Sequence, residues 1–207
     1  MPPEGLLVTL EGGEGAGKSF QARALGRRLR ELGVPYLLTY EPGATELGLR
    51  LRELLMDSSL DISPWTELFL FAADRAQHVQ EVLRPALAAG QVVLCERFND
   101  STIAYQGYGR GLPLATVREV CLGAAGGLVP RLTFLLDVPP EVGLARKMGD
   151  DDRFRHEALE FHRRVREGYL ELARQEPRRI VAVDATLPPQ QVTDLLWEHL
   201  LGLLPPR

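Results

Sequence analysis

The stretch Gly12-Gly13-Glu14-Gly15-Ala16-Gly17-Lys18-Ser19 matches the pattern G-x-x-x-x-G-K-[ST]. It directly follows the apolar run 6–10 and directly precedes a helical pattern over 20–32. A strand, a glycine turn and a helix bring backbone N–H groups and the positive end of the helix to one point, where they bind phosphate. In this pattern Lys18 reaches the β- and γ-phosphates and the Ser19 hydroxyl holds Mg²⁺. The alternative is a glycine turn without a ligand, which is disfavoured because only one other lysine, Lys147, occurs in the chain.

The length and composition favour a single globular domain. With 207 residues the chain can bury a full core, and we expect one domain over 1–207 with a short lid at about 146–156. The net charge of −4 argues against a general nucleic-acid binder. No apolar run approaches the roughly 20 residues of a membrane span, and the start of the sequence lacks the basic region of a signal peptide. We therefore expect a cytoplasmic protein with no nucleic acid and no membrane among its partners.

Short apolar runs alternate with helical patterns along the whole chain. The strand-like runs lie at 6–10, 35–40, 91–96, 132–137 and 179–184. The helical patterns lie at 20–32, 46–56, 65–89, 114–124, from Pro140 onward, at 157–175 and at 188–203. Ser63 is expected to cap the long helix and Pro85 to kink it, and residues 97–113 are expected to form a loop. The alternation predicts an α/β fold, with a five-stranded parallel sheet, helices on both faces, and ligands at the carboxyl ends of the strands.

Two features outside the phosphate loop narrow the class. The chain has no N-K-x-D sequence, which a GTPase would need, and no serine- and glycine-rich signature of a transport ATPase. Instead, the third predicted strand ends in Glu96-Arg97-Phe98, opposite the phosphate loop. Alone, this acid–base pair could be an ion pair without chemistry. In this position it is a candidate for holding a second, acceptor phosphate. Cys95 and Cys121 show no metal-ligand spacing and are expected to be buried free thiols.

Several further segments give a specific resemblance that covers nearly the whole chain. They are residues 11–19, Glu41-Pro42-Gly43-Ala44-Thr45, Leu70-Phe71-Ala72-Ala73-Asp74-Arg75, Glu96-Arg97-Phe98, Ser101-Thr102-Ile103-Ala104-Tyr105-Gln106-Gly107, Leu136-Asp137-Val138, Asp152-Arg153-Phe154 and Asp184-Ala185-Thr186. In their order and spacing the chain resembles thymidylate kinase. The resemblance implies a P-loop kinase fold and ATP-dependent phosphorylation of dTMP to dTDP with Mg²⁺, a step of dTTP biosynthesis. It also implies a homodimer, for which the apolar segment 65–71 could supply the contact face.

The resemblance implies an acceptor site for dTMP. Phe71 would stack on thymine, although alone it could be an ordinary core residue, and Arg75 lies one helical turn further on the same face. Thr102, with Ser101 and Gln106 nearby, would contact the pyrimidine edge. Tyr105 would crowd the sugar 2′ position and so favour deoxyribose; its alternative is an ordinary exposed loop residue. Glu14 stands where the family has an acid near the 3′-hydroxyl.

Charge around the phosphates is implied in the same way. Arg97 would clamp the dTMP phosphate, and Glu96 would act on Mg²⁺ through water. Some members of the family carry an arginine at the position of Gly15, so this chain resembles the bacterial type in which a basic lid supplies that charge. The lid candidates are Arg146, Lys147, Arg153 and Arg155, each of which could instead be a solvated charge. We expect Arg153 to be the transition-state arginine and Arg146 to pack near adenine.

Three positions depart from the family pattern. Tyr40 replaces an arginine before Glu-Pro-Gly, Arg155 replaces an acid after Asp-Arg-Phe, and Glu96 replaces the commoner aspartate.

Two rival functions also fit the phosphate loop. A deoxynucleoside kinase would phosphorylate a 5′-hydroxyl and need a general base, and a non-catalytic nucleotide sensor would bind ATP and a partner protein. The acceptor clamp expected at Arg97 disfavours the sensor.

Overall fold

The computed structural model describes residues 5–146, 153–154 and 157–204. Its centre is a five-stranded parallel sheet in the order β2-β3-β1-β4-β5. The strands are β1 (Leu6–Glu11), β2 (Tyr36–Tyr40), β3 (Val92–Glu96), β4 (Leu132–Asp137) and β5 (Ile180–Asp184). The helices are α1 (Lys18–Glu31), α2 (Glu46–Met56), α3 (Pro64–His78), η1 (Val79–Leu83), α4 (Arg84–Ala88), α5 (Asn99–Thr102), η2 (Ile103–Gly109), α6 (Leu114–Ala124), α7 (Pro140–Arg146), α8 (Leu159–Gln175) and α9 (Pro189–Leu201). The predicted α/β fold is confirmed.

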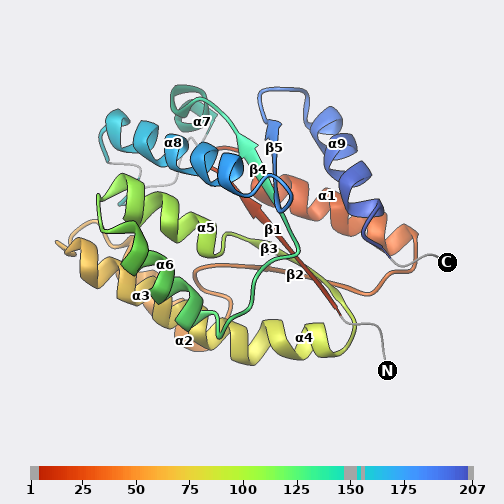
Figure 1. The fold of residues 1–207 in the computed structure, drawn as a ribbon, viewed down its shortest axis with the longest axis horizontal. Coiled ribbons are helices and arrows are strands. Elements are labelled where there is room, and N and C mark those ends of the chain that lie inside the picture. Colours follow the sequence, from red (N-terminus) through yellow and green to blue (C-terminus); the bar gives the residue numbers. More distant parts are fainter. Residues whose placement is uncertain (1–4, 147–152, 155–156, 205–207) are drawn as a thin grey trace.

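Helices cover both faces of the sheet, as Figure 1 shows. On one face, Val8 and Leu10 of β1 pack with Leu25 of α1 and Leu196 of α9 in one apolar cluster. Leu7, which points to the opposite face, belongs to a different cluster that includes residues of η1 and α4. Successive strand residues point to opposite sides, so a strand buried on both faces must be apolar at nearly every position. This explains the unbroken apolar runs in the sequence.

The long helical pattern over 65–89 is divided into three elements. Ser63 caps α3 as expected, because its hydroxyl accepts a hydrogen bond from the Thr66 N–H at 3.3 Å. The π-helical turn η1 comes just before Pro85 and joins α3 to α4. Proline has no N–H, and its ring clashes with the carbonyl four residues earlier, here Glu81. The wider turn lies at this position and keeps the chain helical past the proline.

The expectation of a loop over 97–113 is wrong for most of that segment. Residues 99–109 form α5 and the π-helical element η2, which packs against α8. Glycines suggested a loop, but here they allow close packing. A Cβ atom on Gly107 would lie 2.6 Å from the Leu114 side chain, and one on Gly109 would lie 2.7 Å from the Phe161 ring. The glycines are therefore contact points in a buried helix.

The termini of the strands position the site. The carboxyl ends of β1, β2, β3 and β4 carry Glu11, Tyr40, Glu96 and Asp137, all at the same edge of the sheet. None of the helices in the described part of the chain is long and apolar enough to cross a membrane. Both cysteines are buried and free, as expected.

Candidate functional site

The phosphate-binding loop, residues 12–17, connects β1 to α1. Gly15 and Gly17 have φ angles of 64° and 89°, a conformation that favours glycine. Gly15 also lies against α7, where an added Cβ atom would come 1.9 Å from the carbonyl oxygen of Gly143. This backbone leaves no room for an arginine at position 15. The backbone N–H groups of the loop and the positive end of α1 can bind an anion here, and Lys18 supplies a positively charged side chain beside it.

The Lys18 side chain folds back onto the phosphate loop. Its ammonium group donates hydrogen bonds to the carbonyl oxygens of Gly12 at 3.0 Å and Gly13 at 2.8 Å. Burial, and next the positive charge of Arg97, lower the pKa of Lys18 to about 7. The surroundings of Lys18 therefore compensate poorly for its charged form. An anion beside it would favour the charged form.

Ser19 and Glu96 meet beside the loop. The Ser19 hydroxyl donates a 2.6 Å hydrogen bond to Glu96 Oε2 across α1 and β3. A hydroxyl and a carboxylate oxygen at one point suit a hard divalent cation such as Mg²⁺, which takes oxygen ligands and keeps several waters. The longer arm of glutamate reaches this hydroxyl, so the departure from aspartate leaves the pair intact.

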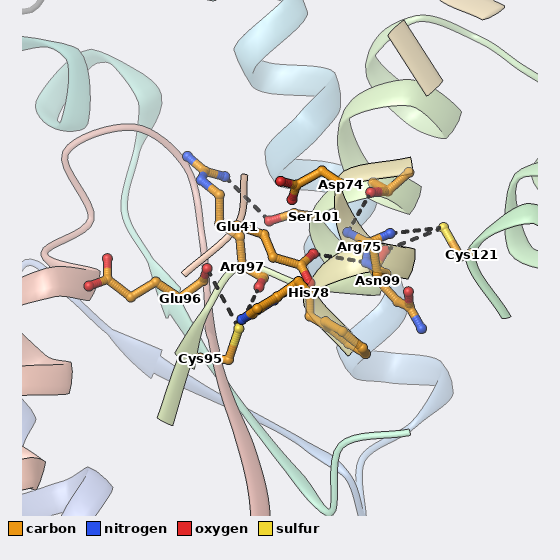
Figure 2. Close-up of polar contacts among 12 residues, drawn as sticks. Glu41, Asp74, Arg75, His78, Cys95, Glu96, Arg97, Asn99, Ser101 and Cys121 are labelled. Atoms are coloured by element: carbon orange, nitrogen blue, oxygen red, sulfur yellow. Dashed lines mark hydrogen bonds and ion pairs between the residues drawn. The ribbon is translucent and has the colours of Figure 1, made fainter. Parts of the chain in front are cut away.

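Arg97 directly follows β3, and its side chain reaches toward Ser101 (Figure 2). Its φ angle of 66° is unusual for a residue other than glycine, which is typical of side chains aimed at a functional site. The guanidinium donates to Glu14 Oε1 at 2.7 Å, to the Ser101 hydroxyl at 3.3 Å and to the Tyr105 hydroxyl at 3.4 Å. Tyr105 also donates to Glu14 at 3.0 Å. The loop acid and the arginine after β3 thus form one connected group.

A cavity of about 540 Å³ opens in front of these residues. This volume is in the range of small-molecule sites. The cavity collects most of the predicted site residues: Glu14, Gly15, Ala16, Gly17, Lys18, Ser19, Phe71, Arg75, Glu96, Arg97, Ser101, Thr102, Tyr105 and Gln106. Gly12 and Gly13 contribute the carbonyls that hold Lys18 instead.

Arg75 is held rigidly at one end of the cavity. It is 2% exposed and pairs through Nε with Glu41 Oε2 at 2.9 Å. Its other nitrogens donate to the Thr102 hydroxyl at 3.0 Å and to Cys121 Sγ at 3.7 Å. Figure 2 shows the contacts of Arg75 with Glu41 and Cys121. A guanidinium fixed on several sides can present a defined edge to a ligand.

The partner of Arg75 belongs to a second buried group. One ligand atom each of Glu41, His78 and Cys95 lies within 4.8 Å of the others. However, Glu41 Oε1 already contacts His78 Nδ1 at 2.9 Å, and His78 Nε2 contacts the Thr39 hydroxyl at 2.7 Å. The glutamate and the histidine are thus already engaged by protein groups. Through Glu41, this group holds the Arg75 side chain in position.

Ser101 reaches the cavity, but its hydroxyl is already engaged. It contacts the buried carboxylate of Glu11 and, at 2.7 Å, the hydroxyl of Tyr169. Burial, and next the negative charge of Asp100, raise the pKa of Glu11 to about 7. Ser101 therefore lines the cavity and connects Arg97 to the buried residues Glu11 and Tyr169.

The two lid arginines that the structure describes make their contacts outside the cavity. Arg146 donates to the Ala185 carbonyl oxygen at 2.8 Å, beside the turn after β5. Arg153, expected at the transferred phosphate, instead pairs with Glu67 at 2.6 Å and donates to the Leu55 carbonyl oxygen at 3.2 Å. The structure thus brings neither arginine into the cavity. Lys147 and Arg155 lie outside the described residues.

Eight further residues line the cavity but were not predicted as site residues: Phe20, Arg23, Tyr40, Glu41, Pro42, Arg52, Met56 and Phe154. Arg23 follows Ser19 by one turn of α1, so helical spacing from the loop could have revealed it. Arg52 donates to the Pro42 carbonyl oxygen at 3.0 Å, which places it at the turn after β2. Tyr40, the departure from the family pattern, lines the same cavity. Arg23 and Arg52 thus add positive charge to the cavity wall, to which Tyr40 contributes no charge.

Comparison with known proteins agrees with this geometry. A family model described as thymidylate kinase matches residues 10–196. The chain is 54% identical over 200 residues to a thymidylate kinase of Synechococcus sp. strain JA-2-3B'a(2-13), covering 97% of this chain and 96% of that protein. It is 49% identical over 196 residues to a thymidylate kinase of Deinococcus radiodurans, covering 94% and 95% of the two chains. The chain belongs to the thymidylate kinase family.

The family match confirms the resemblance seen in the motifs, because it extends across both the phosphate loop and the acceptor segments. A third relative, a thymidylate kinase of Thermosynechococcus vestitus, is 48% identical over 216 residues, covering 98% of this chain and 90% of that protein. The match covers nearly the whole length of both proteins, so the family relationship extends over the described fold. The α/β fold with its phosphate loop is therefore that of thymidylate kinases.

Proposed function

We propose that this phosphotransferase moves the γ-phosphoryl group of ATP to dTMP, giving ADP and dTDP, as a step of dTTP biosynthesis. The observation that carries the proposal is the cavity that joins the phosphate loop to Phe71, Arg75 and Arg97. A donor and an acceptor must lie together for direct transfer. A phosphate-binding loop at one side and an aromatic and arginine wall at the other suit a nucleotide at each.

The donor side is assigned to the phosphate loop, residues 12–19. Its backbone N–H groups and α1 would hold the β- and γ-phosphates, and Lys18 would leave its loop carbonyls to pair with them. Arg146, beside Ala185 at the end of β5, would pack near adenine. Ser19 and Glu96 would hold Mg²⁺, the latter through water. When bound, the metal ion neutralises charge on the transferred phosphoryl group.

The acceptor side is assigned to the opposite wall. Arg97 would clamp the dTMP phosphate in exchange for part of its pairing with Glu14. Phe71 would stack on thymine, with Arg75 and Thr102 at its edge. Tyr105 would occupy the space of a 2′-hydroxyl, and Glu14 would lie near the 3′-hydroxyl. Ser101 and Gln106 complete this wall through their buried hydrogen bonds.

Catalysis in this scheme is positioning and charge neutralisation. The acceptor is an anionic phosphate oxygen, so the step needs no protein nucleophile and no general base. Lys18 and Arg97 supply positive charge on either side of the migrating group. Arg153 was the expected third cation, but its pairing with Glu67 favours a positioning role instead.

The test is a coupled ADP-release assay with ATP, Mg²⁺ and separate acceptors. The acceptors are dTMP, dUMP, UMP, dCMP, AMP and thymidine. We expect dTMP to give the highest rate and UMP to fail. A preference for thymidine over dTMP would instead support a deoxynucleoside kinase. Tight ATP binding without ADP release on any acceptor would support a nucleotide sensor.

We also propose a homodimer. Large apolar side chains on α2 and α3 are exposed in the single chain: Leu47, Leu49, Leu54, Trp65 and Phe69. The two helices pack against each other, so these residues come from one helical pair. Contiguous exposed apolar residues favour association. Light scattering should give twice the mass of the chain at micromolar concentration, and a monomer would contradict the proposal.

The cytoplasm remains the proposed location, since both cysteines are free thiols, as in reducing compartments.

A further inference from the structure

A buried carboxylate outside the cavity gathers several donors. Glu67 of α3 is fully buried and does not line the cavity. Its Oε1 accepts hydrogen bonds from Gln106 at 2.7 Å and Arg110 at 3.1 Å. Its Oε2 accepts from Arg110 at 3.0 Å and from Arg153 at 2.6 Å. Both carboxylate oxygens are thus paired and hydrogen-bonded, which compensates for the cost of burying them. Glu67 therefore fastens η2 and residue 153 to α3.

The segment that Glu67 holds carries an aromatic ring into the cavity. Phe154 follows Arg153 and lines the cavity, although it is only 5% exposed. Its ring centre lies 6.0 Å from that of Phe71 and 5.7 Å from that of Tyr105. The guanidinium carbons of Arg153 and Arg110 lie 4.9 Å and 5.8 Å from the same ring. Phe154 thus connects the Glu67 charge cluster to the two aromatic residues assigned to the acceptor nucleotide.

Besides its pairing with Glu67, Arg153 makes a second contact, with α2. Arg153 Nε donates to the Leu55 carbonyl oxygen at 3.2 Å, near the end of α2. The guanidinium is therefore bonded to α2 and α3 at once and is 12% exposed. A guanidinium engaged on two helices is poorly placed to neutralise a phosphate in the cavity. It is well placed to fix the backbone of the residue that follows it.

We propose that Phe154 forms a wall of the acceptor base site, and that Arg153 and Glu67 are positioning residues that hold it there. The inference rests on the proposed function, because it takes Phe71 as the ring on which thymine stacks. The rings of Phe71 and Phe154 are tilted by 47°, so a base lying on the first meets apolar surface of the second. Arg153 acts on substrate affinity through Phe154.

The test compares four variants with the unmodified enzyme: Phe154→Ala, Arg153→Ala, the double variant, and Phe71→Ala. Arg174→Ala is the matched control, since it removes an arginine from an exposed pair with Glu171 on α8. The readouts are KM for dTMP at saturating ATP, kcat, and the dissociation constant of dTMP by calorimetry. Phe154→Ala and Arg153→Ala should each raise KM and the dissociation constant about tenfold, with kcat within about threefold. The double variant should bind dTMP no more weakly than Phe154→Ala, because both changes remove the same contact.

Three outcomes would overturn parts of this scheme separately. If Arg153→Ala lowers kcat about a hundredfold while dTMP affinity is unchanged, Arg153 acts on the transferred phosphate and its positioning role is wrong. If Phe71→Ala weakens dTMP binding and Phe154→Ala does not, the wall assignment is wrong while the acceptor site stands. If Phe71→Ala has no effect, the acceptor site itself is misassigned.

The variant Arg153→Lys keeps the proposal testable if Arg153→Ala is unfolded. If melting curves show that Arg153→Ala does not fold, Arg153→Lys decides, because it keeps the charge opposite Glu67 and cannot keep both hydrogen-bonded anchors. An affinity for dTMP between those of the unmodified enzyme and Phe154→Ala supports the positioning role. Unchanged affinity with a lower kcat overturns it.

Discussion

Gly15 of the phosphate loop and Gly143 of α7 touch through their backbones. A Cβ atom on Gly15 would lie 1.9 Å from the Gly143 carbonyl oxygen, and one on Gly143 would lie 2.2 Å from the Glu14 carbonyl oxygen. Gly15 therefore makes room for the Gly143 carbonyl, and Gly143 makes room for the Glu14 carbonyl. The contact fastens the phosphate loop to the helix that ends in Arg146. It explains in physical terms why position 15 carries no side-chain cation.

Replacing Gly15 should be far more damaging than replacing a glycine of the same conformation in open space. Gly33 provides that control, because its φ angle of 67° matches the 64° of Gly15 and a Cβ atom added to it would meet nothing within 4 Å. Gly33→Ala should cost about 1 kcal/mol, the penalty of the left-handed conformation. Gly15→Ala should cost at least about 2 kcal/mol more, because backbone must move. Urea denaturation measures both free energies of unfolding, and equal losses would contradict the backbone contact.

Nucleotide binding should be coupled to uptake of a proton at Lys18. The pKa of Lys18 is lowered to about 7 in the free protein, first by burial and then by Arg97. At about pH 8 most of the free protein therefore has a neutral Lys18, and a bound triphosphate raises its pKa and protonates it. Calorimetry of ATP binding in buffers of different ionisation enthalpy should show uptake of about one proton at that pH. Lys18→Gln should lose this uptake, and an unchanged value would assign the proton to another group.

The free energy of unfolding should fall between about pH 4.5 and 7 because of Glu11. Burial, then Asp100, raise the pKa of Glu11 from 4.5 to about 7 in the folded protein. The folded state therefore binds this proton more tightly than the unfolded chain. The resulting stability is complete below pH 4.5 and is lost as the pH rises through about 7, by up to about 3 kcal/mol.

Glu11→Gln tests this assignment, because it keeps the shape of the side chain and removes its titration. The variant should show a flatter dependence of unfolding free energy on pH in that range. Asp74, whose pKa burial and then Glu41 raise to about 6, contributes the same background to both proteins. An identical slope in the two proteins would assign the effect to Asp74 or to another group.

Tyr105 should separate two functions of one side chain. Its ring is proposed to exclude a 2′-hydroxyl, while its own hydroxyl donates to Glu14 and accepts from Arg97. Tyr105→Phe should raise KM for dTMP about threefold to tenfold through loss of these hydrogen bonds, with the preference for dTMP over UMP kept. Tyr105→Ala should relax that preference. If Tyr105→Ala still rejects UMP, another group excludes the 2′-hydroxyl.

Much of the fold could be predicted because its signals are local. Apolar runs gave five strands within one or two residues, and Ser63-Pro64 gave the start of α3. The segment 97–113 failed for a physical reason. Its glycines, which usually mark turns, here permit close contact with Leu114 and Phe161, and such packing depends on residues far away in the sequence.

The candidate site divides in the same way. The gathering of the loop residues and Arg97 around one cavity could be predicted, since a strand followed directly by a motif fixes where side chains gather. Arg153 could not be placed, because its partner Glu67 lies 86 residues earlier in the chain. Nothing local to residue 153 distinguishes an arginine that faces a phosphate from one that faces a buried carboxylate. Phe154 was missed with it, and its place in the cavity depends on the same distant pair.

The pairing of cations in the acceptor site has a consequence for selectivity among anions. Arg97 is paired with Glu14, and Arg75 with Glu41, so each of these guanidinium groups already has a carboxylate partner. A small inorganic anion would have to displace a carboxylate and would gain little else in return. A nucleotide adds contacts through its base and sugar, which can outweigh that exchange.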